Sequence, residues 1–582
     1  MNSNKIIPIM GLLIILVLAI GFASASDADS DLIIGYNSDN IDLITSETVV
    51  DEIDYEENAD ESIANLNDDE IISDDVGSIN DVDREVGVKN SLGASQDSEI
   101  LTSTIQFTQN KYSTYFDASG NIISGKLNKG DILDFSGTFN SKTFIINIPL
   151  TLTSSDGSAK FVDSNFQFVE GADGTNVSYL DVRTGIANKP IFEAINVNNL
   201  TFSNNNLFSS ATSSYPIILR NVNDSNIFFN HVESTIYDGH TPSAIVLSNA
   251  SHNNISSNDV VTNDSNGINL DAYLNSRSIN AYNYIFNNTV HNMRGVEWAL
   301  DANGKVPMPS SFAYGIQVAG QFNEVINNTL YNLYRGISAG NDNKIIGNTI
   351  YNIHGTTNLG NTEEEGGDYA IYAGKNSIVE NNIISNCLFK TSGYAAIYAG
   401  TNSTIKNNTI RNNEGVSISV YGDDIKVLNN EIDVTTSYGV YALGNMANGI
   451  IANNIIKSID ASSIYLEKKK RTEYPHDFII ENNTLYTSNQ NPIFWTDECT
   501  NITVNNNDII LTTHYISESN FFNFFSNELY LNNNVKENDT LVFVGTFNNK
   551  GKIYINNKVN IKGSNAKFID TTFIIINDDV TI

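Results

Sequence analysis

An asparagine-centred phrase recurs along most of this chain, and its spacing restricts the possible folds more than any other feature. The phrase is apolar–x–x–Asn–x–apolar, usually with a second Asn directly before the central one, as in Ile405-Lys-Asn-Asn408-Thr-Ile410. Successive central asparagines lie 20 to 40 residues apart. A repeat whose units are sometimes longer than the minimum length indicates stacked units with loop insertions. The central asparagines are Asn205, Asn230, Asn258, Asn288, Asn328, Asn348, Asn382, Asn408, Asn430, Asn454, Asn483 and Asn507.

A second phrase precedes most of these asparagines by 11 to 14 residues, as in Ile316-Gln-Val318 and Ile371-Tyr-Ala373. Each unit therefore holds short β segments with alternating apolar residues, separated by turns rich in Asn, Gly and Ser. Strands this short cannot form hairpins within a unit, but they can pair with the equivalent strands of the next unit. We therefore predict an all-β solenoid of parallel ladders over residues 104–528.

The repeated asparagine has a physical explanation. An Asn at a turn tolerates left-handed backbone geometry, and its amide can donate to one neighbour and accept from another. Stacked in successive coils, these amides would form a ladder in which each link contributes about 1 kcal/mol. A buried Asn outside the ladder would cost about 1–3 kcal/mol. The ladder therefore also penalises shifts in strand register.

The two phrases resemble those of the right-handed parallel β-helix, or pectin-lyase-like, solenoids. More narrowly, the chain is similar to the secreted adhesin-like proteins of methanogenic archaea. The resemblance covers roughly residues 104–525 and implies a right-handed parallel β-helix with an Asn ladder. It implies little about activity, because the fold carries enzymes, adhesins and tail spikes.

The N-terminal region has the pattern of an exported protein. Lys5 precedes an apolar run over residues 6–22, and Ala23-Ser24-Ala25 follows it, which predicts a signal peptide over residues 1–25. An uncleaved membrane anchor is the alternative. We expect a secreted or cell-surface protein with no membrane span after cleavage.

Residues 26–103 are strongly acidic. Of the formal net charge of −35, residues 27–100 contribute −21, from 23 Asp and Glu against one Arg and one Lys. Such a segment does not bury enough apolar surface to offset its ordering entropy, so we predict a disordered acidic spacer. A propeptide or a calcium-binding tail is the alternative. The acidic balance also argues against a nucleic-acid partner.

The C-terminal residues 529–582 duplicate residues of about 122–175. Asp131-Ile-Leu-Asp-Phe-Ser-Gly-Thr-Phe139 matches Asp539-Thr-Leu-Val-Phe-Val-Gly-Thr-Phe547. We predict the start of a second β-helix unit or a cap. The chain is then either part of a longer protein or ends in a vestigial copy.

No motif in the chain predicts a catalytic or metal centre. No zinc-binding motif occurs, so we expect no metal and no cofactor. The cysteines, Cys387 and Cys499, are predicted to be free thiols several coils apart. The candidates for a secondary, enzymatic reading are Glu297, Asp301 and Asp271, whose insertions could line a groove. Other residues considered for chemistry are Asp423-Asp424, His240 and Glu363–Glu365.

An aromatic stripe is the strongest candidate for binding. The middle residue of the Ile-x-Ala phrase points outward from its strand. Stacked aromatic residues there suit sugar rings or protein contacts, although strands also favour Tyr for its cross-strand packing. In six consecutive units this residue is Tyr372, Tyr398, Ser419, Tyr441, Tyr465 and Phe494.

A basic run and several sequons are two further surface features. The basic run Lys468–Arg471 could bind the acidic spacer or an anionic polymer, or could be a solvated loop. Sequons such as those at Asn199, Asn402 and Asn501 are expected to be glycosylated on outward turns only.

The function that these features favour is an exported, adhesin-like β-helix that presents a binding face to glycans or partner cells. The alternatives are a polysaccharide lyase or glycoside hydrolase and a structural spacer of the cell envelope.

Overall fold

The computed structural model describes residues 102–577 and Val580, apart from 212–213, 235–242, 263–265, 271–279, 293–313, 354–368, 390–393, 435–436, 459–460, 469–473, 488, 490, 512 and 538. The predicted signal peptide and nearly all of the predicted acidic spacer lie outside the described residues.

Three long sheets, in which every neighbouring pair of strands is parallel, make up residues 104–511. Sheet 1 contains β1 (Thr104–Phe107), β2 (Ile132–Phe135), β5 (Thr151–Thr153), β8 (Asn176–Ser178), β11 (Thr201–Ser203), β14 (Asn226–Phe228), β17 (Asn254–Ser256), β20 (Tyr284–Phe286), β23 (Glu324–Ile326), β26 (Lys344–Ile346), β29 (Ile378–Glu380), β32 (Thr404–Lys406), β35 (Lys426–Leu428), β39 (Ile450–Ala452), β43 (Ile479–Glu481) and β46 (Thr503–Asn505).

Sheet 2 contains β4 (Thr143–Ile146), β7 (Asn165–Phe168), β10 (Phe192–Ile195), β13 (Ile217–Arg220), β16 (Ser243–Ser248), β19 (Asn266–Leu270), β22 (Tyr314–Val318), β25 (Arg335–Ala339), β28 (Tyr369–Ala373), β31 (Ala395–Ala399), β34 (Val416–Val420), β37 (Val440–Leu443), β41 (Ile464–Glu467) and β45 (Ile493–Trp495).

Sheet 3 contains β3 (Thr138–Asn140), β6 (Lys160–Val162), β9 (Asp181–Thr184), β12 (Asn206–Ser209), β15 (His231–Ser234), β18 (Asp259–Thr262), β21 (Thr289–Asn292), β24 (Thr329–Leu333), β27 (Thr349–Ile353), β30 (Ile383–Ser385), β33 (Thr409–Asn413), β36 (Glu431–Val434), β40 (Ile455–Ser458), β44 (Thr484–Thr487) and β47 (Asp508–Leu511). A small fourth sheet pairs β38 (Met446–Ala447) with β42 (Pro475–His476).

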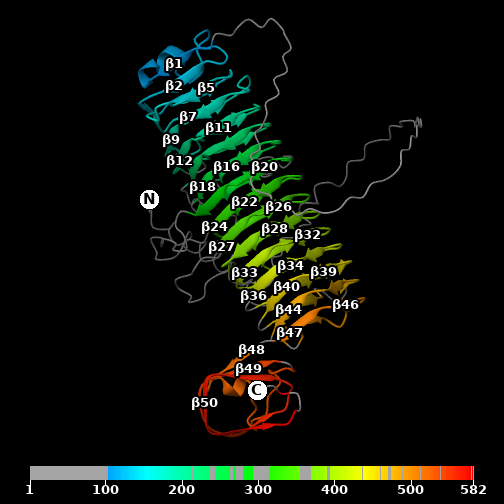
Figure 1. Ribbon diagram of the computed structural model, residues 1–582. Helices are drawn as coiled ribbons and strands as arrows, with labels where there is room; N and C mark the ends of the chain where they lie inside the picture. The colour runs from blue at the N-terminus through cyan, green and yellow to red at the C-terminus, as the bar shows by residue number, and fades with distance from the viewer. Residues whose placement is uncertain are drawn as a thin grey trace, which may run out of the picture. The chain divides into compact units, whose positions relative to one another are not determined.

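The chain winds through these sheets in a fixed order. Each coil passes from sheet 1 to sheet 3 and then to sheet 2, as in β32, β33 and β34, before it returns to sheet 1 one coil further on. Figure 1 shows the successive coils stacked from β1 to β47. The fold is therefore the all-β, right-handed parallel β-helix that was predicted.

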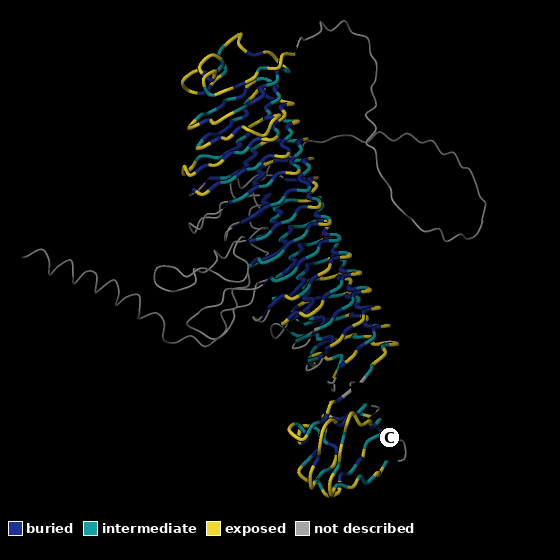
Figure 2. Tube along the Cα trace, turned by 60° about the vertical axis from the view of Figure 1, so that its left-hand side comes forward, coloured by how far each residue is buried: buried dark blue, intermediate teal, exposed yellow. Residues whose placement is uncertain are grey.

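The core of the coil is filled by the central residue of each short strand. In one coil these residues are Ile397, Ile405 and Ile410, all of them fully buried. Figure 2 shows buried residues alternating with more exposed ones along every coil. The first coils use Phe in place of Ile, and α3 (Tyr112–Tyr115), preceded by the 3₁₀ turn η1 (Gln109–Lys111), covers their end. Phe116, next to α3, lies 5.9 Å from Phe107 between ring centroids.

The corner that leads into sheet 2 admits only small residues. A Cβ atom added to Gly336 would lie 2.2 Å from the carbonyl oxygen of Ala370, and one added to Gly439 would lie 2.4 Å from Ile456 Cγ2. Equivalent positions in neighbouring coils hold Ala370, Ala396 and Ser463, which are fully buried. The backbone of the next coil of sheet 2 and the side chains of sheet 3 both approach this position closely, which explains why the residue before the buried Ile or Val of the strand is small.

The predicted Asn ladder is confirmed along its whole length. In all eleven links, Nδ2 of one central Asn donates to Oδ1 of the next, at 2.8 to 3.0 Å from Asn205 to Asn507. The same Oδ1 also accepts the backbone N–H of the preceding Asn, as in Asn382 N to Asn408 Oδ1 at 3.0 Å. The second amide hydrogen binds a backbone carbonyl, as in Asn408 Nδ2 to Val379 O at 3.0 Å. The buried amides are thereby satisfied.

The prediction that the ladder Asn itself adopts left-handed geometry was wrong. The positive φ angle falls on the residue directly before it, for example 56° at Asn407 and 57° at Asn381. That residue is the second Asn of the phrase, and its side chain is exposed. The two asparagines therefore have different roles. The first adopts the left-handed conformation of the turn at low steric cost, and the second forms the ladder.

A second, shorter ladder at the turn before sheet 1 was not predicted. Nδ2 of Asn253 donates to Oδ1 of Asn283 at 3.0 Å, and the chain of bonds continues through Asn323 to Asn343. Ser377 and Ser403 carry it onward with hydroxyl oxygens that accept backbone N–H groups. Two ladders therefore flank sheet 1.

Residues 513–577 form a separate core. Its three-stranded parallel sheet contains β48 (Thr513–Ile516), β49 (Thr540–Ile555) and β50 (Asn560–Ile575), and η2 (Phe521–Asn523) follows β48. Ile516, Phe521 and Phe525, which the repeat register placed in the long coil, have their side chains in this second core.

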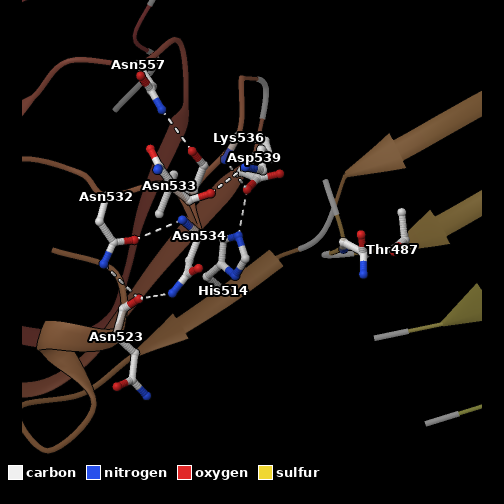
Figure 3. Close-up of polar contacts among 11 residues, drawn as sticks. Thr487, His514, Asn523, Asn532, Asn533, Asn534, Lys536, Asp539 and Asn557 are labelled. Carbon is white, nitrogen blue, oxygen red and sulfur yellow. Dashed lines mark hydrogen bonds and ion pairs between the residues drawn. The ribbon is translucent and has the colours of Figure 1, made fainter. Parts of the chain in front are cut away.

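Polar contacts hold the start of this unit, and the contact between His514 and Asp539 is buried (Figure 3). His514 Nε2 lies 2.6 Å from Asp539 Oδ2, which also accepts the Lys536 N–H at 2.7 Å. Asn523 O accepts the side-chain amides of Asn532 and Asn534. These bonds hold the turns that precede β49.

We expect Asn408→Ala to destabilise the coil by about 2–4 kcal/mol, because it leaves buried groups of Asn382 and Val379 without partners. Thermal or urea unfolding followed by circular dichroism measures the loss. Asn407→Gly is the matched control, since its side chain is exposed and glycine adopts a positive φ freely. Equal losses in the two variants would contradict the ladder's energetic role.

Candidate binding surfaces

The aromatic stripe lies in register on the outward face of sheet 2. Tyr372 pairs with Tyr398, Tyr398 with Ser419, and Ser419 with Tyr441. Tyr441 then pairs with Tyr465 and Tyr465 with Phe494. The six residues whose alignment was predicted therefore occupy one position on six successive strands.

The rings of the stripe stack on one another along the coil. Ring centroids of Tyr372 and Tyr398 lie 5.6 Å apart at an interplanar angle of 20°, and those of Tyr441 and Tyr465 lie 5.8 Å apart at 22°. Tyr465 and Phe494 follow at 5.4 Å and 31°. Such cross-strand aromatic pairs stabilise a sheet, so the stripe also contributes to the stability of sheet 2.

Ser419 interrupts the stack, and two unpredicted tyrosines lie beside the interruption. Tyr421 stacks on Tyr398 at 4.7 Å, and its hydroxyl lies 3.0 Å from that of Tyr372. Tyr438 stacks on Tyr441 at 5.4 Å and on Tyr465 at 4.6 Å. The stripe therefore consists of two thicker aromatic groups.

This stacking changes what the stripe offers to a ligand. Neighbouring rings cover each other's faces. Several hydroxyl groups already have protein partners, because that of Tyr372 lies 3.0 Å from that of Tyr421 and that of Tyr441 donates to Glu467. Only the last strand has well-exposed aromatic rings, with Phe494 41% and Trp495 36% exposed. Open aromatic faces are thus available at this end of the stripe, while the other rings of the stripe are covered by their neighbours.

Burial keeps the phenols protonated. It raises the pKa of Tyr398 to about 12 and also raises that of Tyr372. The pKa of Tyr441 is raised by burial and by the Glu467 carboxylate, to which its hydroxyl donates. The tyrosines therefore remain hydrogen-bond donors far above neutral pH.

We expect an alkaline transition in the folded chain. An unfolded Tyr ionises near the ordinary pKa of 10.0, whereas folded Tyr398 ionises near 12. The folded state therefore loses stability as the pH rises from about 10 to about 12, because the unfolded chain releases these protons more readily. Absorbance at 295 nm during a pH titration, compared with circular dichroism, checks this. Full ionisation of the tyrosines near pH 10 in the folded chain would contradict it.

A cation lies at the start of the stripe. The buried Arg335 side chain donates to Tyr314 Oη at 3.0 Å, and its guanidinium lies 4.9 Å from the Tyr314 ring centroid and 5.7 Å from that of Tyr369. These contacts are cation–π interactions. Burial raises the pKa of Tyr369 well above its usual range.

Two aromatic rows on other faces were not predicted. On sheet 3, His291, Tyr331 and Tyr351 stack at 4.8 and 5.0 Å with nearly parallel planes. The turn row consists of His252, Tyr282 and Phe322, all at positive φ, and Tyr282 is 56% exposed. Counting from each ladder Asn would have aligned both rows, because the turn row lies six residues before it and the sheet 3 row lies three residues after it.

Beside the sheet 3 row, Asp259 joins two histidines. Asp259 Oδ2 lies 2.8 Å from His231 Nδ1, and Oδ1 lies 3.4 Å from His291 Nε2. Across the described ranges, no group of three or more His, Cys, Asp or Glu side chains is arranged to hold a metal ion.

Most of the candidates for the enzymatic alternative lie outside the described residues. Glu297, Asp301 and Asp271 lie outside the described residues, as do His240 and Glu363–Glu365. Asp423 and Asp424 are described and have structural contacts instead. Asp423 Oδ1 accepts the Ala447 N–H at 2.7 Å, and Asp424 Oδ1 accepts Asn448 Nδ2 at 3.2 Å.

The two cysteines are free, as predicted, and both are buried. Burial raises the pKa of the Cys387 thiol to about 12, which makes its thiolate scarce at neutral pH.

We therefore expect neither Cys387 nor Cys499 to react with Ellman's reagent in the folded chain within minutes, and both to react in guanidinium. Rapid labelling of a native thiol would contradict the burial of that cysteine.

The remaining surface features fall partly within the described residues. Lys468 forms an ion pair with Glu498, whereas residues 469–471 of the basic run lie outside. The sequon residues Asn199, Asn402 and Asn501 are exposed at positive φ, in contrast to the buried ladder Asn.

Comparison with known proteins supports the fold. The profile of a family described as "Right handed beta helix region" matches residues 314–473. No curated protein matches the chain significantly. Among the described residues no helix is long and apolar enough to cross a membrane.

Several solved structures are similar at low identity. The tailspike gp61 of Pseudomonas phage phi297 is 12% identical with a TM-score of 0.30, and the match covers 55% of this chain and 48% of the tailspike. The catalytic domain of a GH87 α-1,3-glucanase in complex with nigerose is 11% identical (TM-score 0.33; 72% and 69% covered). The surface adhesin PfbA of Streptococcus pneumoniae is 10% identical (TM-score 0.25; 62% and 86% covered). The chain thus spans about half of the tailspike's length.

Proposed function

We propose that the chain is an exported, cell-surface β-helix protein whose aromatic stripe binds a linear, uncharged polysaccharide of a cell surface. The observation that carries this proposal is the stripe itself, in which five aromatic residues and Ser419 hold one outward position over six strands of sheet 2. Partly exposed aromatic residues aligned over this length favour an extended ligand over a small one.

The chemistry of the stripe supports a sugar ligand. Tyr side chains combine an apolar ring with a hydroxyl group that donates and accepts hydrogen bonds. Sugars likewise have apolar C–H faces and hydroxyl edges. The exposed ring of Phe494 at one end can receive a sugar face, and the phenolic oxygens of the other rings can accept hydrogen bonds from sugar hydroxyls.

The charge around the stripe favours an uncharged polysaccharide. Tyr441 Oη donates to the Glu467 carboxylate, and Lys468 is paired with Glu498. An anionic polymer would be repelled by the Glu467 carboxylate, and Lys468 is already neutralised by Glu498. The chain's net charge of −35 also opposes a polyanion.

Export is supported by the sequence. Lys5, the apolar residues 6–22 and Ala23-Ser24-Ala25 have the order of a secretory signal. A polysaccharide-binding protein outside the cell is an adhesin-like component of the surface, and the acidic residues 26–103 would serve it as a spacer.

We expect the double variant Tyr398→Ser/Tyr441→Ser to lose at least tenfold in affinity on a glycan array or in polysaccharide pull-down, because two stacked groups are removed. Tyr331→Ser/Tyr351→Ser is the matched control on sheet 3 and should bind normally. Circular dichroism checks that both variants remain folded.

The single variant Tyr441→Phe keeps the ring and removes the hydroxyl, so it separates packing from hydrogen bonding. Unchanged binding by the Tyr398→Ser/Tyr441→Ser variant would reject the stripe as the site. Release of reducing sugar by the wild-type chain, abolished by Glu297→Ala/Asp301→Ala, would instead establish the enzymatic alternative. A folded chain that binds no glycan and releases no sugar would support the structural spacer.

A further inference from the structure

The outward face of sheet 1 carries an aromatic patch that is separate from the stripe on sheet 2. Tyr284 and Phe286 project from β20, and their ring centroids lie 5.4 Å apart at an interplanar angle of 17°. Ile326 and Ile346 follow Phe286 in register on β23 and β26, and Phe228 projects from β14. Four of the five successive strands from β14 to β26 therefore have an apolar or aromatic side chain on this face.

Aromatic residues also project from the turns at both edges of sheet 1. At the edge before the strands, the turn row of His252, Tyr282 and Phe322 has ring centroids 5.3 and 5.4 Å apart. At the opposite edge, Phe229 follows β14 and packs on Phe228 at 5.5 Å. Tyr282, Phe322 and Phe229 are 56%, 48% and 60% exposed. These four turn residues and the five residues on the strands make up the sheet 1 patch.

The backbone of these turns is unusual for the side chains that they carry. Tyr282, Phe322 and Phe229 have φ angles of 54° to 58°, a conformation that costs a bulky side chain more than it costs Asn or Asp. In other coils, the turn position of Tyr282 holds residues such as Asn376 and Asn402, also at positive φ. Bulky residues in such conformations are concentrated at functional sites. The chain therefore places rings on this face against the preference of the turn.

The arrangement of the rings favours insertion into an apolar layer. Neighbouring ring planes of the turn row lie within 15° of parallel, so these rings cover each other's faces, and Tyr284 and Phe286 do the same. Few ring faces are left on which a sugar could stack. Insertion into an apolar layer needs no open face, because the gain in free energy depends on the apolar area removed from water.

The charges around the patch restrict the surfaces that it can bind. By strand register, Asp224 and Asp342 lie at the two ends of the turn row. Glu324 and Lys344, on β23 and β26, form an ion pair at 2.9 Å. The charge that remains is negative, as is the net charge of the whole chain, −35. It repels an anionic surface or a second copy of the chain and attracts cationic groups.

We propose that the sheet 1 patch binds the surface of a lipid bilayer whose outermost groups are cationic, as the choline of a zwitterionic lipid is. Aromatic side chains are favoured at the boundary between headgroups and acyl chains, and their rings bind quaternary ammonium groups. Sheets 1 and 2 are different sides of the coil, so a bilayer on sheet 1 leaves the aromatic stripe accessible. The exported chain lies on a membrane in this arrangement and presents the stripe to its ligand.

A tryptophan reporter in the full-length chain tests the proposal. With phosphatidylcholine vesicles, we expect the emission of the Tyr282→Trp variant to shift to shorter wavelength and to be quenched by brominated acyl chains. Tyr486→Trp, at an exposed position of sheet 3, is the matched control and should show at least fivefold less quenching. The wild-type chain gives the signal of Trp298 and Trp495, which is subtracted. Because quenching reports contact at the substituted position, the apolar residues 6–22 do not contribute to the difference.

Further variants separate the rings from the charges. In the Tyr282→Trp chain, Phe322→Asn should lower the quenching at least threefold, since it removes a neighbouring ring and introduces the residue that other coils have at this turn. Tyr486→Ser in the same chain should leave the quenching unchanged. Phosphatidylglycerol vesicles should quench less than phosphatidylcholine vesicles, because Asp224 and Asp342 repel them. Circular dichroism checks that each variant is folded.

Several results would overturn the proposal. Equal quenching of Tyr282→Trp and Tyr486→Trp, no quenching of Tyr282→Trp, or quenching by phosphatidylglycerol that equals that by phosphatidylcholine would each do so. Loss of polysaccharide binding in Tyr282→Asn/Phe322→Asn, without quenching of Tyr282→Trp, would assign the patch to a glycan. An oligomer in light scattering that the same double variant dissociates, again without quenching, would assign it to a second copy.

The stripe and the sheet 1 patch can fail separately. The Tyr398→Ser/Tyr441→Ser variant removes glycan binding by the stripe, and with Tyr282→Trp added it should retain the full quenching by phosphatidylcholine vesicles.

Discussion

The buried amide-to-amide hydrogen bond between asparagines of successive coils is the interaction on which the rest of the structure depends. An amide in the core is tolerated only when its donors and acceptor are all engaged. Each ladder Asn meets this condition only if its strand neighbours are in register. A shift by one residue would leave Asn408, for example, without the bonds to Asn382 and Asn430. The ladder therefore fixes which residues of sheet 2 come to lie beside one another.

This dependence explains why so much of the fold followed from the sequence. The ladder Asn residues and the alignment of Tyr372 through Phe494 could be found by counting, because both follow from the repeat. The left-handed residue was misplaced by one position, since two adjacent asparagines fit the turn equally well on paper. The ladder through Asn253 and Asn283 was not predicted because the residue type at this position changes along the chain. Later coils have Ser377, Ile425 and Phe478 there.

The chemistry of the surface was harder to predict. The alternation of residues along the strand predicts that Tyr398 points outward. Its side-chain torsions decide whether the ring presents its face or its edge to solvent. Tyr421 and Tyr438 lie outside the repeated phrase position and contact the rings on either side of Ser419, which no spacing rule reveals. Asp424 was paired with Asp423 by sequence adjacency, whereas the structure uses it as a left-handed turn residue bound to Asn448.

The direction of the ladder has an electrostatic consequence. Every Nδ2 group points toward the following coil and every Oδ1 toward the preceding one, from Leu180 N–H at the start to Asn507 at the end. The amide dipoles thus add head to tail, much as peptide dipoles do in a helix. The ladder therefore contributes a dipole along the axis of the coil, with its positive end at Asn507.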